Sequence, residues 1–209
     1  MEKREEMDKI EADMRAADLP LKSANLVFGE GNLDCDVMFI GEAPGMNEDL
    51  QKRPFVGRAG QLLNKLIAEI GWKREDVYIT NIVKRRPPEN RDPEPHEIES
   101  YKPYLARQIE IIAPKVIAPL GRFSMNYFLP YAKISRDHGK VFEQNHHLIV
   151  PLYHPAAALR ATAVLEDLRK DFMRLPKIVS GEITEFEDVI IPDISPKKKG
   201  RENLQEGLF

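Results

Sequence analysis

The sequence predicts an α/β protein of three layers, α/β/α, around a central four-stranded parallel sheet. Four short apolar runs, at residues 37–40, 77–83, 115–120 and 147–152, alternate with segments of helical periodicity. This alternation is typical of a parallel sheet with helices on both faces. Hydrophobic residues make up 42% of the 209-residue chain and charged residues 31%, as in ordinary globular proteins.

The elements are expected in the following order. Residues 1–18 form a charged amphipathic helix with Met7, Ile10 and Met14 at helical spacing, and residues 19–36 are irregular. A loop of about twenty residues follows the first strand, and loops of this length inside a domain are usually functional. The remaining helices are expected at 61–70, about 96–112, 121–128 and about 156–175.

We expect residues 1–191 to form one domain and residues 192–209 to form a flexible tail, because this last stretch is rich in Pro, Lys and Gly. The N-terminus is charged and has no apolar signal core, and no run is long enough to span a bilayer. An intracellular protein is therefore expected, with no membrane partner.

Composition also limits the chemistry. The single cysteine, Cys35, excludes an internal disulfide framework and any Cys-based metal site within the chain, and we expect no metal ion. The net charge of −3 gives no global basic footprint, so local basic patches would have to hold a nucleic acid.

Three polar side chains follow directly on apolar runs. Glu42 comes after 37–40, Asn81 closes Val77-Tyr78-Ile79-Thr80, and His154 follows 147–152. In parallel sheets the ligand crevice lies outside the carboxyl ends of the strands, so the carboxylate, amide and imidazole are expected in one pocket.

Between about residues 24 and 175 the sequence resembles the family 4 uracil-DNA glycosylases of the uracil-DNA glycosylase superfamily. Five motifs in the same order carry the resemblance. They are Val27-Phe28-Gly29-Glu30-Gly31-Asn32, Gly41-Glu42-Ala43-Pro44-Gly45, Arg53-Pro54-Phe55-Val56-Gly57, Thr80-Asn81-Ile82-Val83-Lys84 and His154-Pro155-Ala156.

The resemblance implies an enzyme that flips uracil out of single- or double-stranded DNA and hydrolyses its N-glycosidic bond. Asn81 would pair with the uracil edge, Phe55 would stack on the base, and His154 would donate to uracil O2. Glu42 would work on the sugar side, as a general base or as an electrostatic stabiliser. Glu48 would form the pocket wall near uracil C5.

Small residues leave the backbone amides of Gly41, Ala43 and Gly45 open to a ligand. Cations beside Asn81 are expected to contact phosphates. They are Lys84, Arg85, Arg86 and Arg91. By resemblance, Leu159 or Arg160 fills the space that the flipped base leaves; alternatively, Leu159 belongs to the core of the last helix.

One departure from the family is large. Its members usually hold a [4Fe–4S] cluster with four cysteines, and the aligned positions here are about Ala16, Leu19, Arg85 and Tyr101. A Cys₄ cluster cannot form from these side chains, so no cofactor is expected. Packing of Leu19 and Tyr101, with salt bridges from Arg85, is expected to take its structural place.

Other readings remain open. Glu42 and the small Gly45 leave room for a purine, which allows hypoxanthine or xanthine removal. A second alternative is a uracil-DNA binding protein that turns over poorly. Gln205, Leu208 and Phe209 resemble the peptide by which bacterial repair proteins dock on the sliding clamp. We further expect a monomer in the prokaryotic cytoplasm, associated with the nucleoid.

Overall fold

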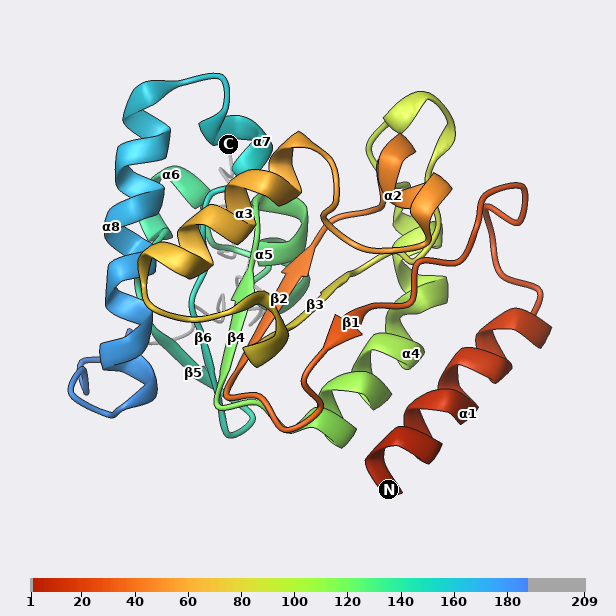
Figure 1. Ribbon diagram of the computed structural model, residues 1–209, viewed down its shortest axis with the longest axis horizontal. Coiled ribbons are helices and arrows are strands. Elements are labelled where there is room, and N and C mark those ends of the chain that lie inside the picture. Colours follow the sequence, from red (N-terminus) through yellow and green to blue (C-terminus); the bar gives the residue numbers. More distant parts are fainter. Residues whose placement is uncertain (1, 188–209) are drawn as a thin grey trace, which may run out of the picture.

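A six-stranded sheet forms the centre of the computed structural model, which describes residues 2–187 (Figure 1). The strand order is β1-β3-β2-β4-β6-β5. The strands are β1 (Glu30–Gly31), β2 (Val37–Gly41), β3 (Tyr78–Asn81), β4 (Val116–Pro119), β5 (Phe142–Gln144) and β6 (His147–Ile149).

The four inner strands are parallel, and they are the four that the sequence predicts. The α/β class is therefore confirmed. The predicted count of four strands is wrong, because β1 and β5 add an antiparallel strand at each edge. These edge strands have two and three residues, too few for a periodic pattern.

The helices agree with the predicted ones except in three regions, which are the loop after β2, the loop before β5 and the segment 156–175. The helices are α1 (Glu2–Ala16), α2 (Met46–Gln51), α3 (Arg58–Glu69), α4 (Pro95–Ile112), α5 (Arg122–Phe128), α6 (Ile134–Asp137), α7 (Pro155–Ala158) and α8 (Thr162–Val179), with 3₁₀ turns η1 (Arg74–Asp76) and η2 (Pro88–Asn90). The long loop after β2 contains α2, and the single helix expected at 156–175 is divided into α7 and α8.

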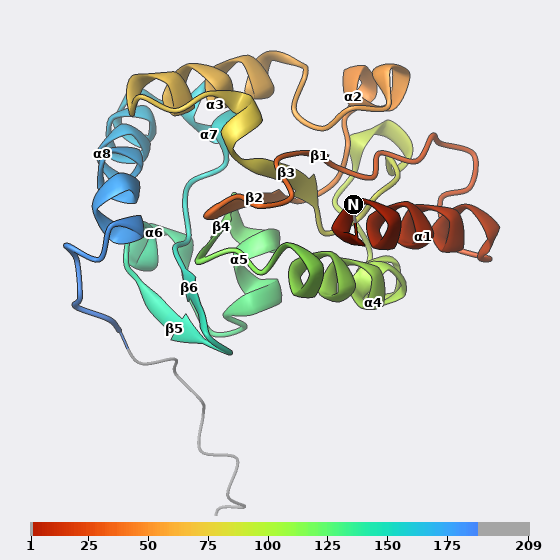
Figure 2. The same ribbon diagram turned by 60° about the horizontal axis from the view of Figure 1, so that its bottom comes forward.

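Helices cover both faces of the sheet, as Figure 2 shows. Alternate residues of β2 point to opposite faces: Met38 and Ile40 pack in the core with α1 and α4, whereas Val37 and Phe39 pack with α3 and α8. All four side chains are at most 2% exposed. Two hydrophobic cores, one on each face, thus fix the three-layer arrangement. Cys35 is buried in the first core.

The carboxyl ends of the inner strands meet at one edge of the sheet. Gly41 at the end of β2 is in register with Asn81 at the end of β3, and a bridge joins Leu120 and Leu152 beyond β4 and β6. The backbone N–H of Ile82 donates to the Gly41 carbonyl at 2.9 Å, which continues the pairing past the strand ends. This edge therefore brings the segments after β2, β3, β4 and β6 together.

No helix within residues 2–187 is long and apolar enough to cross a membrane. The predicted tail at 192–209, with Gln205, Leu208 and Phe209, lies outside the described residues, as does the end of the predicted domain.

Candidate active site

A cleft of about 420 Å³ opens at the carboxyl edge of the sheet. Most residues predicted for the site line it, although they come from five separate segments of the chain. The lining residues are Glu42, Ala43, Gly45, Glu48, Phe55, Ala59, Asn81, Asn90, Asp92, His154, Ala156 and Arg160.

Gly41 packs closely against two of the predicted site residues, Asn81 and Phe55. A Cβ atom at this position would lie 2.4 Å from Asn81 Oδ1 and 2.6 Å from the Phe55 ring. A side chain here would displace the amide or the ring, so glycine is required for this close approach. Asn81 is 2% exposed, and no group within residues 2–187 hydrogen-bonds to its side-chain amide, which leaves both its donor and its acceptor for a ligand.

His154 stands opposite Phe55, with ring centroids 5.7 Å apart. It is the N-cap of α7, and its Nδ1 accepts a hydrogen bond from the Ala156 N–H at 3.1 Å. A neutral imidazole whose Nδ1 accepts carries its proton on Nε2. Burial lowers the pKa of His154 to about 4, against a smaller opposing effect of Glu48. The ring is therefore neutral at pH 7 and presents an N–H donor.

Glu42 brings an unusually weakly acidic carboxyl group to the cleft. Burial, followed by the negative charge of Asp92, raises its pKa to about 7, while Arg122 opposes that rise. Arg122 and Asp92 also form an exposed ion pair at 3.7 Å. A carboxyl group with this pKa can exchange a proton near neutral pH, as general bases do.

Glu48 has a second contact besides the cleft wall. Its Oε1 accepts hydrogen bonds from the backbone N–H groups of Val56 at 2.9 Å and Gly57 at 2.7 Å. Its Oε2 would lie 2.8 Å from a Cβ at Gly45, so the carboxylate fills the space beside that glycine. Glu48 therefore shapes the cleft and also holds the loop that carries Phe55.

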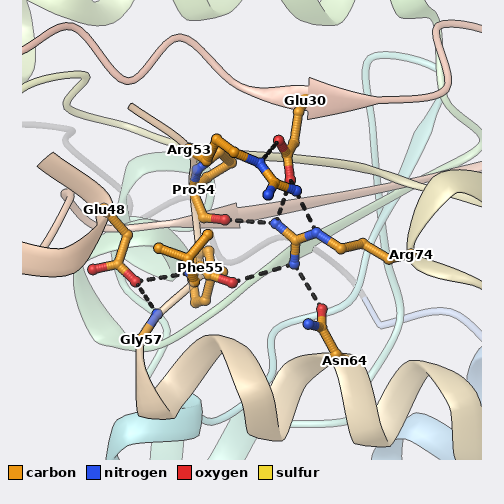
Figure 3. A network of polar contacts seen from close by, with 9 residues as sticks. Glu30, Glu48, Arg53, Pro54, Phe55, Gly57, Asn64 and Arg74 are labelled. Atoms are coloured by element: carbon orange, nitrogen blue, oxygen red, sulfur yellow. Dashed lines mark hydrogen bonds and ion pairs between the residues drawn. The ribbon is translucent and has the colours of Figure 1, made fainter. Parts of the chain in front are cut away.

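The Phe55 loop is fixed by a network of polar contacts (Figure 3). Phe55 is 5% exposed and has a backbone φ of 51°, a left-handed conformation that is unusual for a bulky residue. Arg74 of η1 donates to the carbonyls of Pro54 and Phe55 and pairs with Glu30 of β1.

The prediction that Lys84 contacts DNA phosphates is wrong. Its side chain is fully buried, and its Nζ donates to Thr80 Oγ1 and to Gln108 Oε1, each at 2.5 Å. Burial lowers its pKa well below the ordinary lysine value. These two hydrogen bonds join Thr80 of β3 to Gln108 of α4 through Lys84, inside the core.

The predicted phosphate-binding arginines differ in their contacts. Arg91 makes a bidentate pair with Glu97 at 2.6 and 2.8 Å, and Arg86 donates to Asn90 Oδ1 at 2.7 Å. Arg160 lines the cleft. DNA contact by these three remains a prediction. Leu159 is 43% exposed at the end of α7, which excludes the alternative that it is a core residue.

The four positions aligned with the family's cluster ligands do not fit an iron–sulfur cluster. None supplies a thiolate, and the fully buried Tyr101 fills this corner, its hydroxyl donating to the Pro20 carbonyl at 2.7 Å. Leu19 is buried in the same core, whereas Ala16 is exposed at the end of α1. In the described part of the chain, no group of three or more His, Cys, Asp or Glu side chains is arranged to hold a metal ion.

The contacts of Arg85 differ from the salt bridges that were expected to help replace the cluster. Across residues 2–187 it forms no salt bridge; instead it donates to the Ala24 carbonyl and lies beside the Tyr101 hydroxyl. Burial raises the pKa of Tyr101 to about 12, an effect that Arg85 partly offsets. The corner is therefore held by apolar packing and hydrogen bonds to carbonyl groups.

Sequence reasoning missed several residues of the site. Asn90 and Asp92 line the cleft, but their segment was interpreted only as a source of phosphate contacts. Arg122, at the start of α5, and Arg74 were also missed. The signal for Asp92 is its place beside Arg91 in the motif, whereas Arg74 lies 19 residues from Phe55 and gives no local signal.

The fold and cleft together define a class of protein: an α/β protein whose cleft brings an aromatic side chain, an amide and a neutral imidazole together. The sequence matches the Uracil DNA glycosylase superfamily over residues 28–174, well over half of its length. The chain belongs to this superfamily.

Its relatives include several proteins named Type-4 uracil-DNA glycosylase. The chain is 44% identical to that of Archaeoglobus fulgidus over 173 residues, covering 78% of this chain and 87% of the relative. It is also 44% identical to that of Saccharolobus solfataricus over 189 residues, covering 86% and 88%. With the Thermotoga maritima protein the identity is 44% over 164 residues, covering 74% and 85%.

Proposed function

We propose that this protein is a monofunctional uracil-DNA glycosylase, which hydrolyses the N-glycosidic bond of uracil in DNA and leaves an abasic site for base excision repair. The observation that carries the proposal is the convergence of Asn81, Phe55, His154 and Glu42 on one cleft. Membership of the superfamily and the names of the relatives support it.

Recognition follows from the free amide of Asn81. Its N–H₂ donates to uracil O4 and its carbonyl accepts from N3–H, whereas cytosine presents the opposite pattern at these positions. The base must leave the stack to reach the amide, and Phe55 supplies the ring on which it stacks. Glu48 fills the space beside Gly45 and opposes the methyl group of thymine.

Catalysis requires help on both sides of the bond. As the N1–C1′ bond breaks, its electron pair goes to the uracil ring, and the Nε2–H of His154 donates to O2, where negative charge grows. Water forms the new bond to C1′. Glu42 stands on the sugar side, where its carboxylate either takes the proton of this water or stabilises the cationic sugar.

The first experiment compares matched oligonucleotides that carry uracil, hypoxanthine, or thymine opposite guanine, with alkali cleavage as the readout. We expect cleavage of the uracil strand alone. His154→Ala should lower kcat by about 10²- to 10³-fold, the usual cost of losing one donor to developing negative charge. Met173→Ala, an exposed change on α8, serves as the control and should match the wild type.

The other outcomes separate the alternatives. Cleavage of hypoxanthine without uracil would move the specificity to a purine, for which the small Gly45 leaves room. Tight binding of uracil DNA without cleavage would make the protein a catalytically weak binder and would contradict the roles of His154 and Glu42.

Three finer proposals accompany this function. The enzyme acts without an iron–sulfur cluster, which the packing of Tyr101 supports and which stoichiometric iron in the purified protein would contradict. Its C-terminal peptide, with Gln205, Leu208 and Phe209, docks on a sliding clamp, a proposal supported by the motif alone. We also propose a monomer that works in the prokaryotic cytoplasm at the nucleoid.

A further inference from the structure

We propose that Arg74 is a positioning residue which, paired with Glu30, holds Phe55 in the conformation that stacks on the flipped base. This inference rests on the proposed function and deepens it. Arg74 does not line the cleft, so it acts through Phe55 and not on the substrate.

The first observation is the backbone of Phe55. Its φ of 51° lies in the left-handed region, where a large side chain is strained and relaxes unless its surroundings hold it. The loop is also tightly packed, because a Cβ on Gly60 would lie only 1.9 Å from the Phe55 carbonyl oxygen. The strained conformation therefore needs, and has, a close-fitting support.

The second observation is how Arg74 contacts this loop. Its Nη2 donates to the Pro54 carbonyl at 2.5 Å and its Nη1 to the Phe55 carbonyl at 3.3 Å. The same Nη1 donates to Asn64 Oδ1 on α3 at 2.7 Å. One planar guanidinium thus fixes the two carbonyls that set the direction of the Phe55 side chain. Lysine offers a single point charge and cannot reproduce this geometry.

The third observation is that Arg74 is itself anchored. Glu30 of β1 accepts from Arg74 Nε at 3.0 Å and Nη2 at 2.7 Å, and from Arg53 Nε at 2.7 Å. Burial alone would raise the pKa of Glu30, but the hydrogen bonds from Arg53 and Arg74 lower it, so the carboxylate stays ionised. The anchor therefore connects the edge of the sheet to the cleft.

Phe55 is held from its other side as well. Glu48 Oε1 accepts from the backbone N–H groups that follow Phe55, while Arg74 donates to the carbonyls at and before it, as Figure 3 shows. The two contacts bind the two ends of the same short loop. Glu48 lines the cleft and Arg74 does not, so a change at Arg74 tests the support of the loop without altering the cleft wall.

The test is a double-mutant cycle on uracil DNA with Arg74→Met, Phe55→Ala and the double variant. Stacking contributes to ground-state binding and to the transition state, so Arg74→Met should raise KM about tenfold and leave kcat nearly unchanged. In the Phe55→Ala background the same change should alter KM by less than about twofold, because coupled residues are not additive. Arg74→Lys should fall between wild type and Arg74→Met.

Arg107→Gln is the matched control, since it removes an arginine from an exposed ion pair with Asp13 on the helices away from the cleft. It should keep the wild-type KM. A general loss of stability would lower the active fraction of enzyme in both backgrounds and leave KM alone. If Arg74→Met does not fold, the same double-mutant cycle with Phe55→Ala is measured with Arg74→Lys and with Glu30→Gln.

The inference is overturned if the effects of Arg74→Met and Phe55→Ala on KM multiply, or if Arg74→Met has the wild-type KM. If the wild-type protein does not cleave uracil DNA, the proposed function fails, and chymotryptic cleavage after Phe55 then tests the support directly. Arg74→Met should be cut faster than Arg107→Gln; equal rates would refute the support.

Discussion

The pKa of Glu42, raised to about 7 by burial and by Asp92, gives the enzyme an expected pH profile. Both proposed roles of Glu42 need the carboxylate, so kcat should fall as the pH drops through about 7. The ring of His154, with a pKa of about 4, stays neutral over this range and does not cause the fall.

Two substitutions should move the acidic limb of this pH profile, where kcat falls, in opposite directions. Asp92→Asn removes a negative charge, lowers the pKa of Glu42 and shifts the limb to lower pH, whereas Arg122→Gln removes the opposing cation and shifts it to higher pH. Single-turnover rates between pH 5 and 9 measure both shifts. If the two variants and the wild type share one limb, Glu42 is not the group that titrates.

Residue-level prediction succeeded where a side chain follows a strand and failed where ordinary tendencies are reversed. Glu42, Asn81 and His154 could be placed together because parallel strand ends meet at one edge. Lys84 was misplaced because lysine is almost never fully buried unless it has partners, and its partner Gln108 lies 24 residues away on another element. Pairing at that distance leaves no local trace in the sequence.

At the scale of elements, Lys84 makes the junction of β3 and α4 sensitive to pH. An unfolded chain keeps the lysine proton until about pH 10. The folded protein has a lowered pKa, so over the interval between the two the unfolded state binds more protons and the free energy of unfolding rises with pH.

Lys84→Met should remove this dependence. Below about pH 10 and above the lowered pKa of Lys84 in the fold, the wild type should gain stability relative to the variant as the pH rises, by up to about 1.4 kcal/mol per pH unit. Urea unfolding of both proteins at several pH values measures the difference, in which the titrations of all other groups cancel. A difference that stays constant with pH would mean that Lys84 is charged in the fold.

The exposed Leu159 directly follows the short helix α7, and it is the residue predicted to enter duplex DNA. If Leu159 fills the space of the flipped base, Leu159→Ala should lower activity on duplex uracil DNA about tenfold and leave single-stranded substrate unchanged, because only the duplex must be unstacked. Equal losses on both substrates would show that Leu159 does not act as a wedge. Met173→Ala, another exposed apolar side chain, is the control.

The sequence predicted the long helices and the buried strands well and the other short elements poorly. The helices α1, α3 and α4 are periodic over enough residues to be recognised, and the inner strands lie in apolar runs of at least four residues. The short elements β1, β5, α2 and α6 have no such run. The division between α7 and α8 falls at Leu159, Arg160 and Ala161, and neither Gly nor Pro marks it. The helix break at Leu159 therefore has no signal in the sequence.

For the whole molecule, every proposed catalytic group lies at one edge of the sheet, at the top of Figure 1, while α1 and the body of α4 lie below it. The net charge is −3, so any attraction of DNA is expected to come from local cations, such as Arg160 in the cleft. This separation also explains why the corner at Tyr101 can differ from the usual family arrangement while the cleft keeps its residues.

The burial of Cys35 has a consequence for how this protein responds to oxidants. Cys35 is the one thiol of the whole chain, and burial raises its pKa to about 11, so almost none of it is thiolate at neutral pH. Oxidants react with the thiolate and not with the thiol. In the folded protein Cys35 is therefore a poor target for peroxide.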